Sequence, residues 1–358
     1  MGIVMRKSLL ILLLLAGGVA HAASFDCSKA KSPQEKAICS SAKLSAADDQ
    51  LAAAYKAWLA AVPPDVVPEV REEQRGWLRS LASACKSEEA ASTTALASCM
   101  LNVYPSRIKE LRSKALTLSG VTFYWRSITL KTPDGPDDVD PEMRQYEVNP
   151  GFGTLSATWP QTADSTPEWK AWNVAIEAVS QQMASESNGE ASKKPGGKWV
   201  AEAGADVQIT TSIGVVTPEL VTAAIQIMVD GHGAHPNTNS IQFNWLLKET
   251  RVLMPKDVFR AGSGWEHFLQ KRCDKYLHEQ LDPNFDGKSY ESFAQPGEMA
   301  KTLHGIVIEP RNWQLDGNGL TIPFQPYAVA CYACTPPPVT IPWGDLKPYL
   351  LVSFVTPK

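Results

Sequence analysis

The sequence predicts an α+β protein of two modules, a small disulfide-stapled all-helical module followed by a larger module of mixed helices and strands. Between positions 44 and 116, apolar residues recur at steps of three and four, as on one face of a helix. From Val121 onward, runs rich in β-branched and aromatic residues are interspersed with helical stretches, without the regular alternation of a parallel α/β sheet. Four of the seven cysteines lie in the first module and three lie far downstream.

The first 22 residues have the pattern of a cleaved signal peptide. Arg6 and Lys7 precede an apolar run at positions 8–20, and Ala20 and Ala22 fit the small-x-small cleavage rule. A helix that spans a bilayer needs roughly 20 apolar residues, so this run is too short to be a membrane span. We therefore expect cleavage near Ala22 and a periplasmic or secreted protein with no stable membrane anchor.

Export favours structural disulfides, because thiols at close spacing are oxidised outside the cytosol. In the first module the simplest pairing joins Cys27 to Cys39 and Cys85 to Cys99, since each bond closes a short loop. Four cysteines allow two other connectivities, and the sequence leaves both open.

The three downstream cysteines predict one further bond. Cys331 and Cys334 form a Cys-x-x-Cys pattern followed by three prolines, and we expect them in a local or long-range disulfide. One cysteine of the last three, counting Cys273, is then left free or pairs between molecules.

Charge divides along the same line as the cysteines. Residues 23–116 contain 13 Lys and Arg against 11 Asp and Glu, a net charge of +2. Residues 117–358 contain 19 against 27, a net charge of −8. An acidic protein is a poor partner for nucleic acid, and it favours a cationic partner. We expect a helical domain at 23–116 and an α+β domain at 117–358, with subparts at 117–225 and 226–358.

Three helices are expected in the first module. One spans residues 44–62 and stops at Pro63 and Pro64, because proline cannot continue the backbone hydrogen-bond ladder. The second carries Val70, Trp77 and Leu81 on one stripe and ends near Cys85. The third covers residues 90–116, where we expect Pro105 to kink or split it.

The residues of these helices follow an ordered pattern that resembles the N-terminal domain of the LprI-type lysozyme inhibitors. The pattern consists of Cys27, Glu35, Ile38, Cys39, Leu44, Asp48, Leu51, Tyr55, Gln74, Trp77, Leu78, Cys85, Tyr104, Arg107, Ile108 and Leu111. The resemblance covers essentially the whole module and implies that the protein binds lysozyme. We expect Tyr55, Trp77 and Tyr104 to be core residues, because aromatic side chains at helical spacing are ordinarily buried.

In the second module the pattern predicts strands at 121–130, 206–217, 220–231, 240–249, 303–310, 312–327 and 339–343. It predicts a helix at 169–184 and another within 258–281. On the latter, Trp265, Leu269, Cys273 and Leu277 share one face.

Four stretches of this module are similar to the C-terminal domain of RsiV-type anti-sigma factors. They are "VDGHGAHPNTNSIQFNWLL", "DVFRAGSGWEHFL", "LTIPFQPYAVACYA" and "VTIPWGDLKPYL". In RsiV-type proteins this region binds lysozyme, and the same domain accompanies exported polysaccharide deacetylases. The resemblance implies a lysozyme-binding or wall-associated second module. The chain lacks a cytoplasmic sigma-binding segment, so the signalling role of that family is not expected.

Two short motifs suggest metals, and simpler interpretations are preferred for both. His232 and His235 are three residues apart in a turn, whereas a helical zinc site places them four apart. We expect His235 to be hydrogen-bonded within the turn.

The second motif lies in a polar segment that opens like a calcium loop, with Asp282, Asn284 and Asp286 at its first, third and fifth positions. Phe293 stands where that loop requires a bidentate Glu, so a plain turn is preferred over a Ca²⁺ site. We expect no cofactor and no catalytic constellation.

The sequence thus favours an exported binding protein, not an enzyme, that inhibits or sequesters lysozyme by covering its substrate cleft. The alternative is a module that binds peptidoglycan or another glycan, or that assists a cell-wall enzyme. The expected partner-binding residues lie in one proline-rich loop and in the downstream turn: Asp134, Asp137, Asp138, Asp140, Glu142 and His235. The acidic loop is expected to steer a basic enzyme toward the protein.

Overall fold

The computed structural model describes residues 23–135, 140, 142, 151–187, 199, 201–231, 235–281 and 297–357. The chain forms two compact units that divide between Lys114 and Ala115, and the predicted α+β class is confirmed. The expected signal peptide lies outside the described residues. Within those residues, every helix is too short or too polar to cross a bilayer.

The first unit consists of helices, some of which begin with a side chain that caps free backbone N–H groups. The helices are α1 (Pro33–Ser40), α2 (Ala42–Ala61), α3 (Val67–Ala84), α4 (Lys86–Ala91) and α5 (Thr93–Ser113), after a 3₁₀ turn at Cys27–Lys29. Ser32 and Glu35 form a capping box on α1, while Ser41 and Ser92 accept hydrogen bonds at the starts of α2 and α5. The pair Pro63–Pro64 follows the end of α2, as expected.

The core of this unit lies between α2 and α5, whose buried residues include Leu44 and Trp58 on α2 and Met100 on α5. The third predicted helix is divided before Thr93 into α4 and α5. Of the two outcomes expected at Pro105, a split does not occur, since α5 continues through this residue. Pro105 is exposed, so its ring lies at the helix surface and does not disturb the core.

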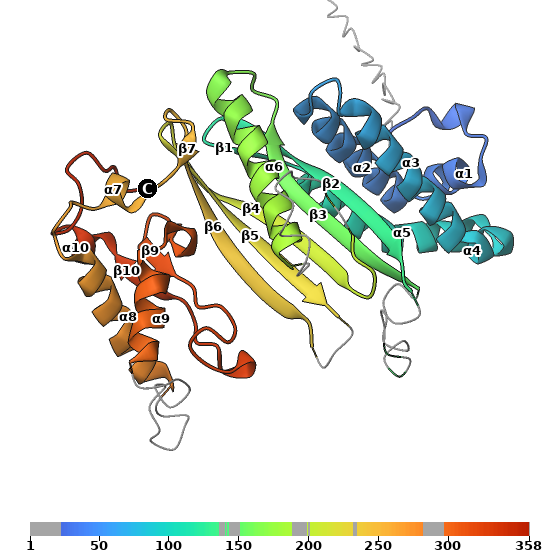
Figure 1. Ribbon diagram of the computed structural model, residues 1–358. Coiled ribbons are helices and arrows are strands. Elements are labelled where there is room, and N and C mark those ends of the chain that lie inside the picture. Colours follow the sequence, from blue (N-terminus) through green and yellow to red (C-terminus); the bar gives the residue numbers. More distant parts are fainter. Residues whose placement is uncertain are drawn as a thin grey trace, which may run out of the picture. The chain divides into compact units, whose positions relative to one another are not determined.

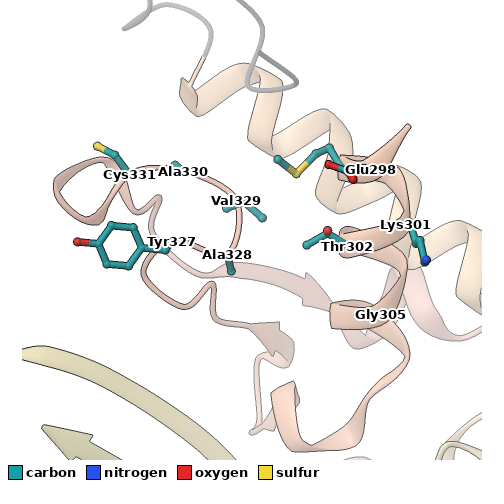
Figure 2. A pocket seen from close by; sticks show the side chains of 10 residues that line it. Glu298, Lys301, Thr302, Gly305, Tyr327, Ala328, Val329, Ala330 and Cys331 are labelled. Atoms are coloured by element: carbon teal, nitrogen blue, oxygen red, sulfur yellow. The ribbon is translucent and has the colours of Figure 1, made fainter. Parts of the chain in front are cut away.

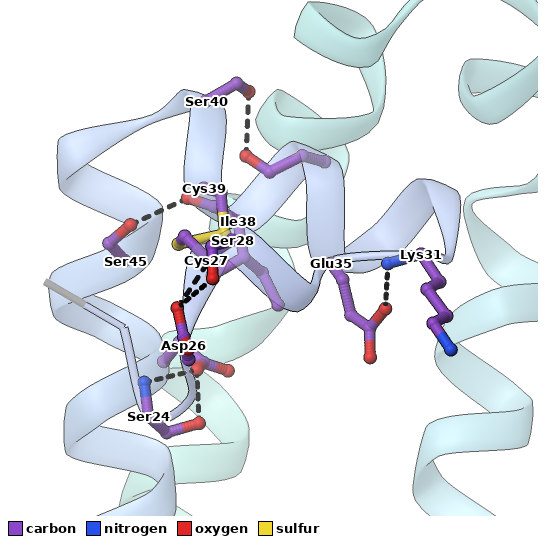
Figure 3. The surroundings of a disulfide bond; sticks show 12 residues. Ser24, Asp26, Cys27, Ser28, Lys31, Glu35, Ile38, Cys39, Ser40 and Ser45 are labelled. Carbon is purple, nitrogen blue, oxygen red and sulfur yellow. Dashed lines mark hydrogen bonds between the residues drawn. A yellow bond between two sulfur atoms is a disulfide. The ribbon is translucent and has the colours of Figure 1, made fainter. Parts of the chain in front are cut away.

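Two disulfides close this unit, Cys27–Cys39 and Cys85–Cys99, as the simplest pairing predicted. The first joins the 3₁₀ turn to α1, and the second joins the end of α3 to α5. Figure 3 shows the surroundings of Cys27–Cys39, where the Ser45 hydroxyl donates to the carbonyl of Ile38 at 2.7 Å. This hydrogen bond joins α2 to α1, and the disulfide joins the 3₁₀ turn to α1, so the three elements are held together.

The second unit is built on a seven-stranded sheet in the order β1-β2-β3-β4-β5-β6-β7. The strands are β1 (Ala115–Leu118), β2 (Val121–Pro133), β3 (Phe152–Thr162), β4 (Asp206–Val216), β5 (Leu220–Asp230), β6 (Asn237–Leu246) and β7 (Arg251–Val252). All neighbours are antiparallel except β3 and β4, which are parallel. The parallel connection contains α6 (Pro167–Ser187), which crosses one face of the sheet (Figure 1).

The face beneath α6 is apolar, and the other face is polar. Trp172 and Ile176 of α6 are fully buried with Leu155, Ile209 and Ile225 of the sheet. Because side chains alternate along a strand, the neighbouring residues lie on the opposite face. There the pairing register aligns one row of hydroxyl and amide side chains across five strands: Ser127, Thr158, Thr210, Gln226 and Ser240. We call these five residues the polar row.

A second core lies beyond β7. Helices α8 (Trp265–Leu281) and α9 (Glu298–Ile308) pack side by side with a small sheet of β8 (Gln314–Leu315), β9 (Gly319–Ile322) and β10 (Val339–Pro342) (Figure 1). Short helices α7 (Pro255–Val258) and α10 (Trp343–Leu346) complete it. The predicted stripe of Trp265, Leu269, Cys273 and Leu277 is buried along α8.

One predicted strand is wrong. Residues 303–310 contain three β-branched residues, yet most of this segment belongs to α9. Met299, Leu303 and Val307 are spaced by four and are all buried, so the helical period decides the structure. The converse error concerns β3, which the pattern did not predict. Its Gly153 and Pro160 are poor strand residues, and the strand is held by pairing on both sides.

Candidate functional site

A buried carboxylate lies at the centre of the helical unit. Asp48 of α2 accepts hydrogen bonds at one oxygen from the Ser24 backbone N–H (3.1 Å) and hydroxyl (2.6 Å). Its other oxygen accepts from the Tyr104 hydroxyl of α5 at 3.3 Å. Burial, followed by the charge of Asp48, raises the pKa of Tyr104 well above its ordinary value. The tyrosine is therefore held as a neutral donor that links α5 to α2.

A second buried polar group links α5 to α3. Arg107, with only 3% of its surface exposed, donates to the Gln74 carboxamide oxygen from Nη2 (2.8 Å) and Nε (3.3 Å). Its Nη1 is 2.9 Å from Glu110 and 3.2 Å from Glu73. Its guanidinium also lies 5.6 Å from the centre of the Trp77 ring. A buried cation needs such partners, since an unpaired charge is costly to bury.

These polar residues coincide with those that carry the LprI resemblance. Asp48, Gln74, Tyr104 and Arg107 all lie inside the unit and bond to one another's helices. Of the aromatic residues expected in the core, Tyr104 is buried and Tyr55 and Trp77 are half-buried. These four buried residues of the pattern therefore hold the helices together, and a partner is left to contact the outer surface.

The outer surface of α3 exposes an apolar side chain. Leu78 is 48% exposed, the highest value for a large apolar residue in the described helical unit. Half-buried Trp77 precedes it, and Glu72, Arg75 and Arg79 form ion pairs on the same helix. An apolar centre with a charged rim is the usual composition of a protein–protein contact.

The predicted acidic loop is only partly described. Asp134 is half-buried, and its Oδ1 accepts a hydrogen bond from the Gly204 N–H at 2.8 Å. Asp140 and Glu142 are exposed, and the backbone N–H of Glu142 donates to Asp140. Asp137 and Asp138 lie outside the described residues, as do Asp282, Asn284 and Asp286 of the calcium-like segment. Asp134 thus has a structural bond that the sequence did not reveal.

His235 is exposed and belongs to an aromatic cluster. Its ring stacks on Tyr332 with centroids 4.0 Å apart, and its Nε2 is 3.3 Å from the hydroxyl of Tyr327. Its Nδ1 lies 3.1 Å from the carbonyl oxygen of Pro236, while His232 and the rest of the expected turn lie outside the described residues. His235 begins the turn into β6 and Asp134 follows β2, so both lie at one end of the sheet. They are four strands apart, roughly 19 Å at a strand spacing of about 4.8 Å.

The two tyrosines come from the connection between β9 and β10, residues 323–338, which we call the disulfide loop. Cys331 and Cys334 are bonded across a 3₁₀ turn in this loop. Tyr327 has φ +65°, a left-handed conformation that a bulky residue rarely adopts, and 62% of its surface is exposed. Gln325 attaches the loop to β6, because its amide accepts from the Ser240 N–H (3.0 Å) and donates to the Ser240 carbonyl (2.8 Å).

Cavities flank the disulfide loop on both sides. One of about 820 Å³ separates it from α9, with residues 327–331 on one side and Glu298, Lys301, Thr302 and Gly305 on the other (Figure 2). The other, of about 490 Å³, separates the loop from the polar face of the sheet. It is lined by Gln208, Thr210, Gln226, Ile227, Met228, Thr238, Asn239, Ser240, Phe324, Gln325, Pro326 and Thr335. We call the second one the amide cavity.

Sequence reasoning did not find the amide cavity. Its lining comes from β4, β5, β6 and the disulfide loop, which are up to about 130 positions apart in the chain. The alternation of polar residues along β4 and β5 was the available signal, but it does not say what faces them. In the described part of the chain, no group of three His, Cys, Asp or Glu residues is placed to hold a metal ion.

Comparison with known proteins finds a match to one family in the first unit and to another in part of the second unit. Residues 27–111 match the family described as lysozyme inhibitor LprI, and residues 256–344 match a family described as a protein of unknown function, DUF3298. The predicted recognition of the helical module is thereby confirmed. A search of curated proteins found no match.

Two similar solved structures are crystal structures of DUF3298 family proteins, one from Bacteroides fragilis and one from Pseudomonas aeruginosa. The first is 15% identical with a TM-score of 0.41, and the second is 15% identical with a TM-score of 0.40. Each alignment covers 64% of this chain and 94% of the other.

Proposed function

We propose that this protein is an exported inhibitor of a lysozyme-type glycosidase and that its helical unit anchors the target. The observation that carries this proposal is the match of residues 27–111 to the lysozyme inhibitor LprI family. The matched range runs from Cys27 nearly to the end of α5, so it spans the packed unit, not a short motif. It includes both disulfides and the buried pair of Gln74 and Arg107.

We also propose a periplasmic or secreted location, which the disulfides support. Its two disulfides, and that of the disulfide loop, favour an oxidising compartment. The signal peptide expected at residues 1–22 would deliver the chain there.

The proposed mechanism is steric. Lysozyme-type glycosidases hold two carboxyl groups in a cleft through which the polysaccharide passes. A protein that covers the cleft stops hydrolysis without any chemistry of its own, provided that the interface is of ordinary size, about 1,200–2,000 Å² in total.

We propose the outer surface of α3 as the anchoring contact. Leu78 is the exposed apolar centre, and Trp77 supports it from a half-buried position. The ion pairs of Glu72 with Arg75 and Arg79 lie to one side of this centre and supply polar groups that tolerate water at an interface rim. Aromatic and apolar anchors within a polar rim provide most of the binding energy in protein complexes.

The second unit has a different proposed role. Its sequence carries the net charge of −8, which attracts a basic enzyme over distances of about a Debye length. Asp140 and Glu142 of the acidic loop are exposed and belong to this field. The resemblance to the RsiV-type domain supports a contribution of this unit to lysozyme binding.

The test is inhibition of lysozyme by the mature chain, residues 23–358. Leu78→Asp places a charge at the proposed contact centre, and we expect the inhibition constant to rise at least tenfold, about 1.4 kcal/mol. Val174→Asp is the matched control, because Val174 is an exposed apolar residue of α6 (71%) outside both matched ranges. We expect this control to inhibit like the wild type.

Two outcomes contradict the proposal at different levels. Equal inhibition by Leu78→Asp and wild type would move the contact away from α3. A wild-type chain that neither inhibits nor retains lysozyme in a pull-down would overturn the function itself.

A further inference from the structure

The amide cavity has a lining that differs from the rest of the surface of this acidic unit. None of its twelve described lining residues is charged. Eight are amides or hydroxyls, and the remainder are apolar. Its volume of about 490 Å³ lies within the range of about 300–1,000 Å³ for small-ligand sites.

Several of these polar groups are available to a ligand. Gln208, Thr210 and Gln226 make no side-chain hydrogen bond to any residue that the structure describes, and all three are exposed. Thr210 pairs with Gln226 across β4 and β5, so the two side chains lie next to each other on the polar row. A carboxamide offers both a donor and an acceptor, which is the requirement for binding a hydroxyl or another amide.

The opposite wall of the cavity is joined to the sheet by hydrogen bonds. Gln325 is bonded through both atoms of its amide to the backbone of Ser240, which keeps the disulfide loop at β6. Phe324 and Pro326 on either side of it supply apolar surface. Tyr327, the next residue, lines the other cavity, and its hydroxyl is 3.3 Å from Nε2 of His235.

We propose that the amide cavity binds a neutral, N-acetylated sugar unit of a glycan chain. An ionic ligand would find no group of opposite charge among the lining residues, whereas a neutral polar ligand finds both donors and acceptors there. A sugar presents neighbouring hydroxyls to Gln208, Thr210 and Gln226. An acetamido group adds an amide that pairs with a carboxamide and a methyl group that contacts Phe324 and Pro326.

This site is separate from the lysozyme contact proposed on α3, and neither proposal depends on the other. Glycan binding would place the protein on a polysaccharide, whatever enzyme the helical unit binds. Variants in the amide cavity are expected to inhibit lysozyme in solution as the wild type does.

The probe is the β-1,4-linked trisaccharide of N-acetylglucosamine, titrated calorimetrically into the mature chain. We expect saturable binding, and a roughly tenfold weaker Kd for Gln226→Ala and for Gln208→Ala, because each removes hydrogen bonds to the sugar. The matched control is Gln314→Ala, an exposed glutamine of β8 that does not line the cavity. Its Kd is expected to be unchanged. Cellotriose, which has the same linkage without acetamido groups, is expected to bind at least tenfold more weakly.

Cosedimentation distinguishes two sources of this sugar. Retention on purified peptidoglycan that is lost in Gln226→Ala would support a cell-wall glycan, whereas retention on chitin alone would support another N-acetylated polysaccharide. The proposal is overturned if millimolar trisaccharide does not bind the wild type, or if the two cavity variants bind it as tightly as Gln314→Ala does. Equal affinity for cellotriose would remove the acetamido assignment.

Discussion

Arg107 and Gln74 are joined by two hydrogen bonds in the interior of the helical unit, because the Nη2–H and Nε–H groups of the Arg107 guanidinium both donate to the carboxamide oxygen of Gln74. The pair connects α5 to α3, a helix that buries only Val70, Gln74 and Leu81. Because so few residues of α3 reach the core, this hydrogen-bonded pair contributes much of what holds α3 to α5. The proposed contact residue Leu78 lies on this same helix, one turn beyond Gln74.

Replacing Gln74 by Met should therefore destabilise the helical unit. The substitution keeps the side-chain length but leaves two buried N–H groups of Arg107 unpaired, and we expect a loss of about 1–3 kcal/mol in the free energy of unfolding. Gln50→Met is the matched control, since Gln50 accepts from Arg112 at 3.3 Å on the exposed surface. That change should alter stability by less than about 0.5 kcal/mol. Urea denaturation of the two variants gives the comparison, and equal losses would contradict a structural role for the buried pair.

The disulfides of the helical unit should differ in their effect from that of the disulfide loop. Cys27–Cys39 and Cys85–Cys99 join residues 12 and 14 positions apart, whereas Cys331 and Cys334 are separated by three. Loop-closure entropy predicts a loss of about 3 kcal/mol for either of the former and about 2 kcal/mol for the latter. Thermal unfolding of the three double-serine variants tests this order of stability losses. If the Cys331–Cys334 variant lost the most stability, loop-closure entropy would not govern the order.

Stability should fall at alkaline pH because of Tyr104. Burial and the nearby Asp48 raise the pKa of Tyr104 in the folded protein above its ordinary value of 10.0, so the folded state binds its proton more tightly than the unfolded state does. The resulting stabilisation is fully present below pH 10 and is lost as pH rises toward the folded pKa. In Tyr104→Phe this part of the alkaline loss should disappear. The absorbance of tyrosinate as a function of pH measures the ionisation directly, and ionisation of Tyr104 at pH 10 with the protein still folded would contradict the prediction.

A smaller effect of opposite sign is expected at acidic pH. Arg251 donates to both carboxylate oxygens of Asp257 at 2.7 and 2.8 Å, and these hydrogen bonds are the main cause that lowers the pKa of Asp257. Its stabilisation is present above the ordinary pKa of 3.8 and is lost as pH falls through the lower, folded value. Because the pair is half-buried and still screened by solvent, Asp257→Asn should cost about 1 kcal/mol or less at pH 7. Denaturation at pH 7 and at pH 2 should show the difference between variant and wild type shrinking in acid.

Neutralising the acidic loop should slow association with a basic lysozyme. Asp134 is kept, because its carboxylate holds Gly204, and Asp137, Asp138, Asp140 and Glu142 are changed to their amides. We expect a lower association rate at low salt, little change in dissociation, and no difference at high salt, where charges are screened. Surface plasmon resonance across a salt series measures both rates. Identical association rates at low salt would remove the steering role of the loop.

Local patterns in the sequence determined much of this protein. Helical periodicity placed α2, α3, α6 and the buried stripe of α8, and the cysteine spacing indicated both disulfides of the helical unit. These features depend on neighbours within a few turns of the chain, which a single sequence displays directly. The predicted strand at 303–310 failed because β-branched residues favour strands only weakly, and burial of Met299, Leu303 and Val307 at helical spacing outweighed that preference.

Only the tertiary structure decided where the chemistry lies. The residues of the LprI pattern could be read in the sequence, but their burial, and hence their role in joining helices, depends on the packing of α2, α3 and α5. The polar row exists because pairing in register brings five strands side by side, and one residue of slip would turn each side chain to the other face. The amide cavity further requires Gln325 to meet Ser240, 85 positions away. Such contacts are set by the whole fold, because their free energy depends on groups that no local stretch of sequence contains.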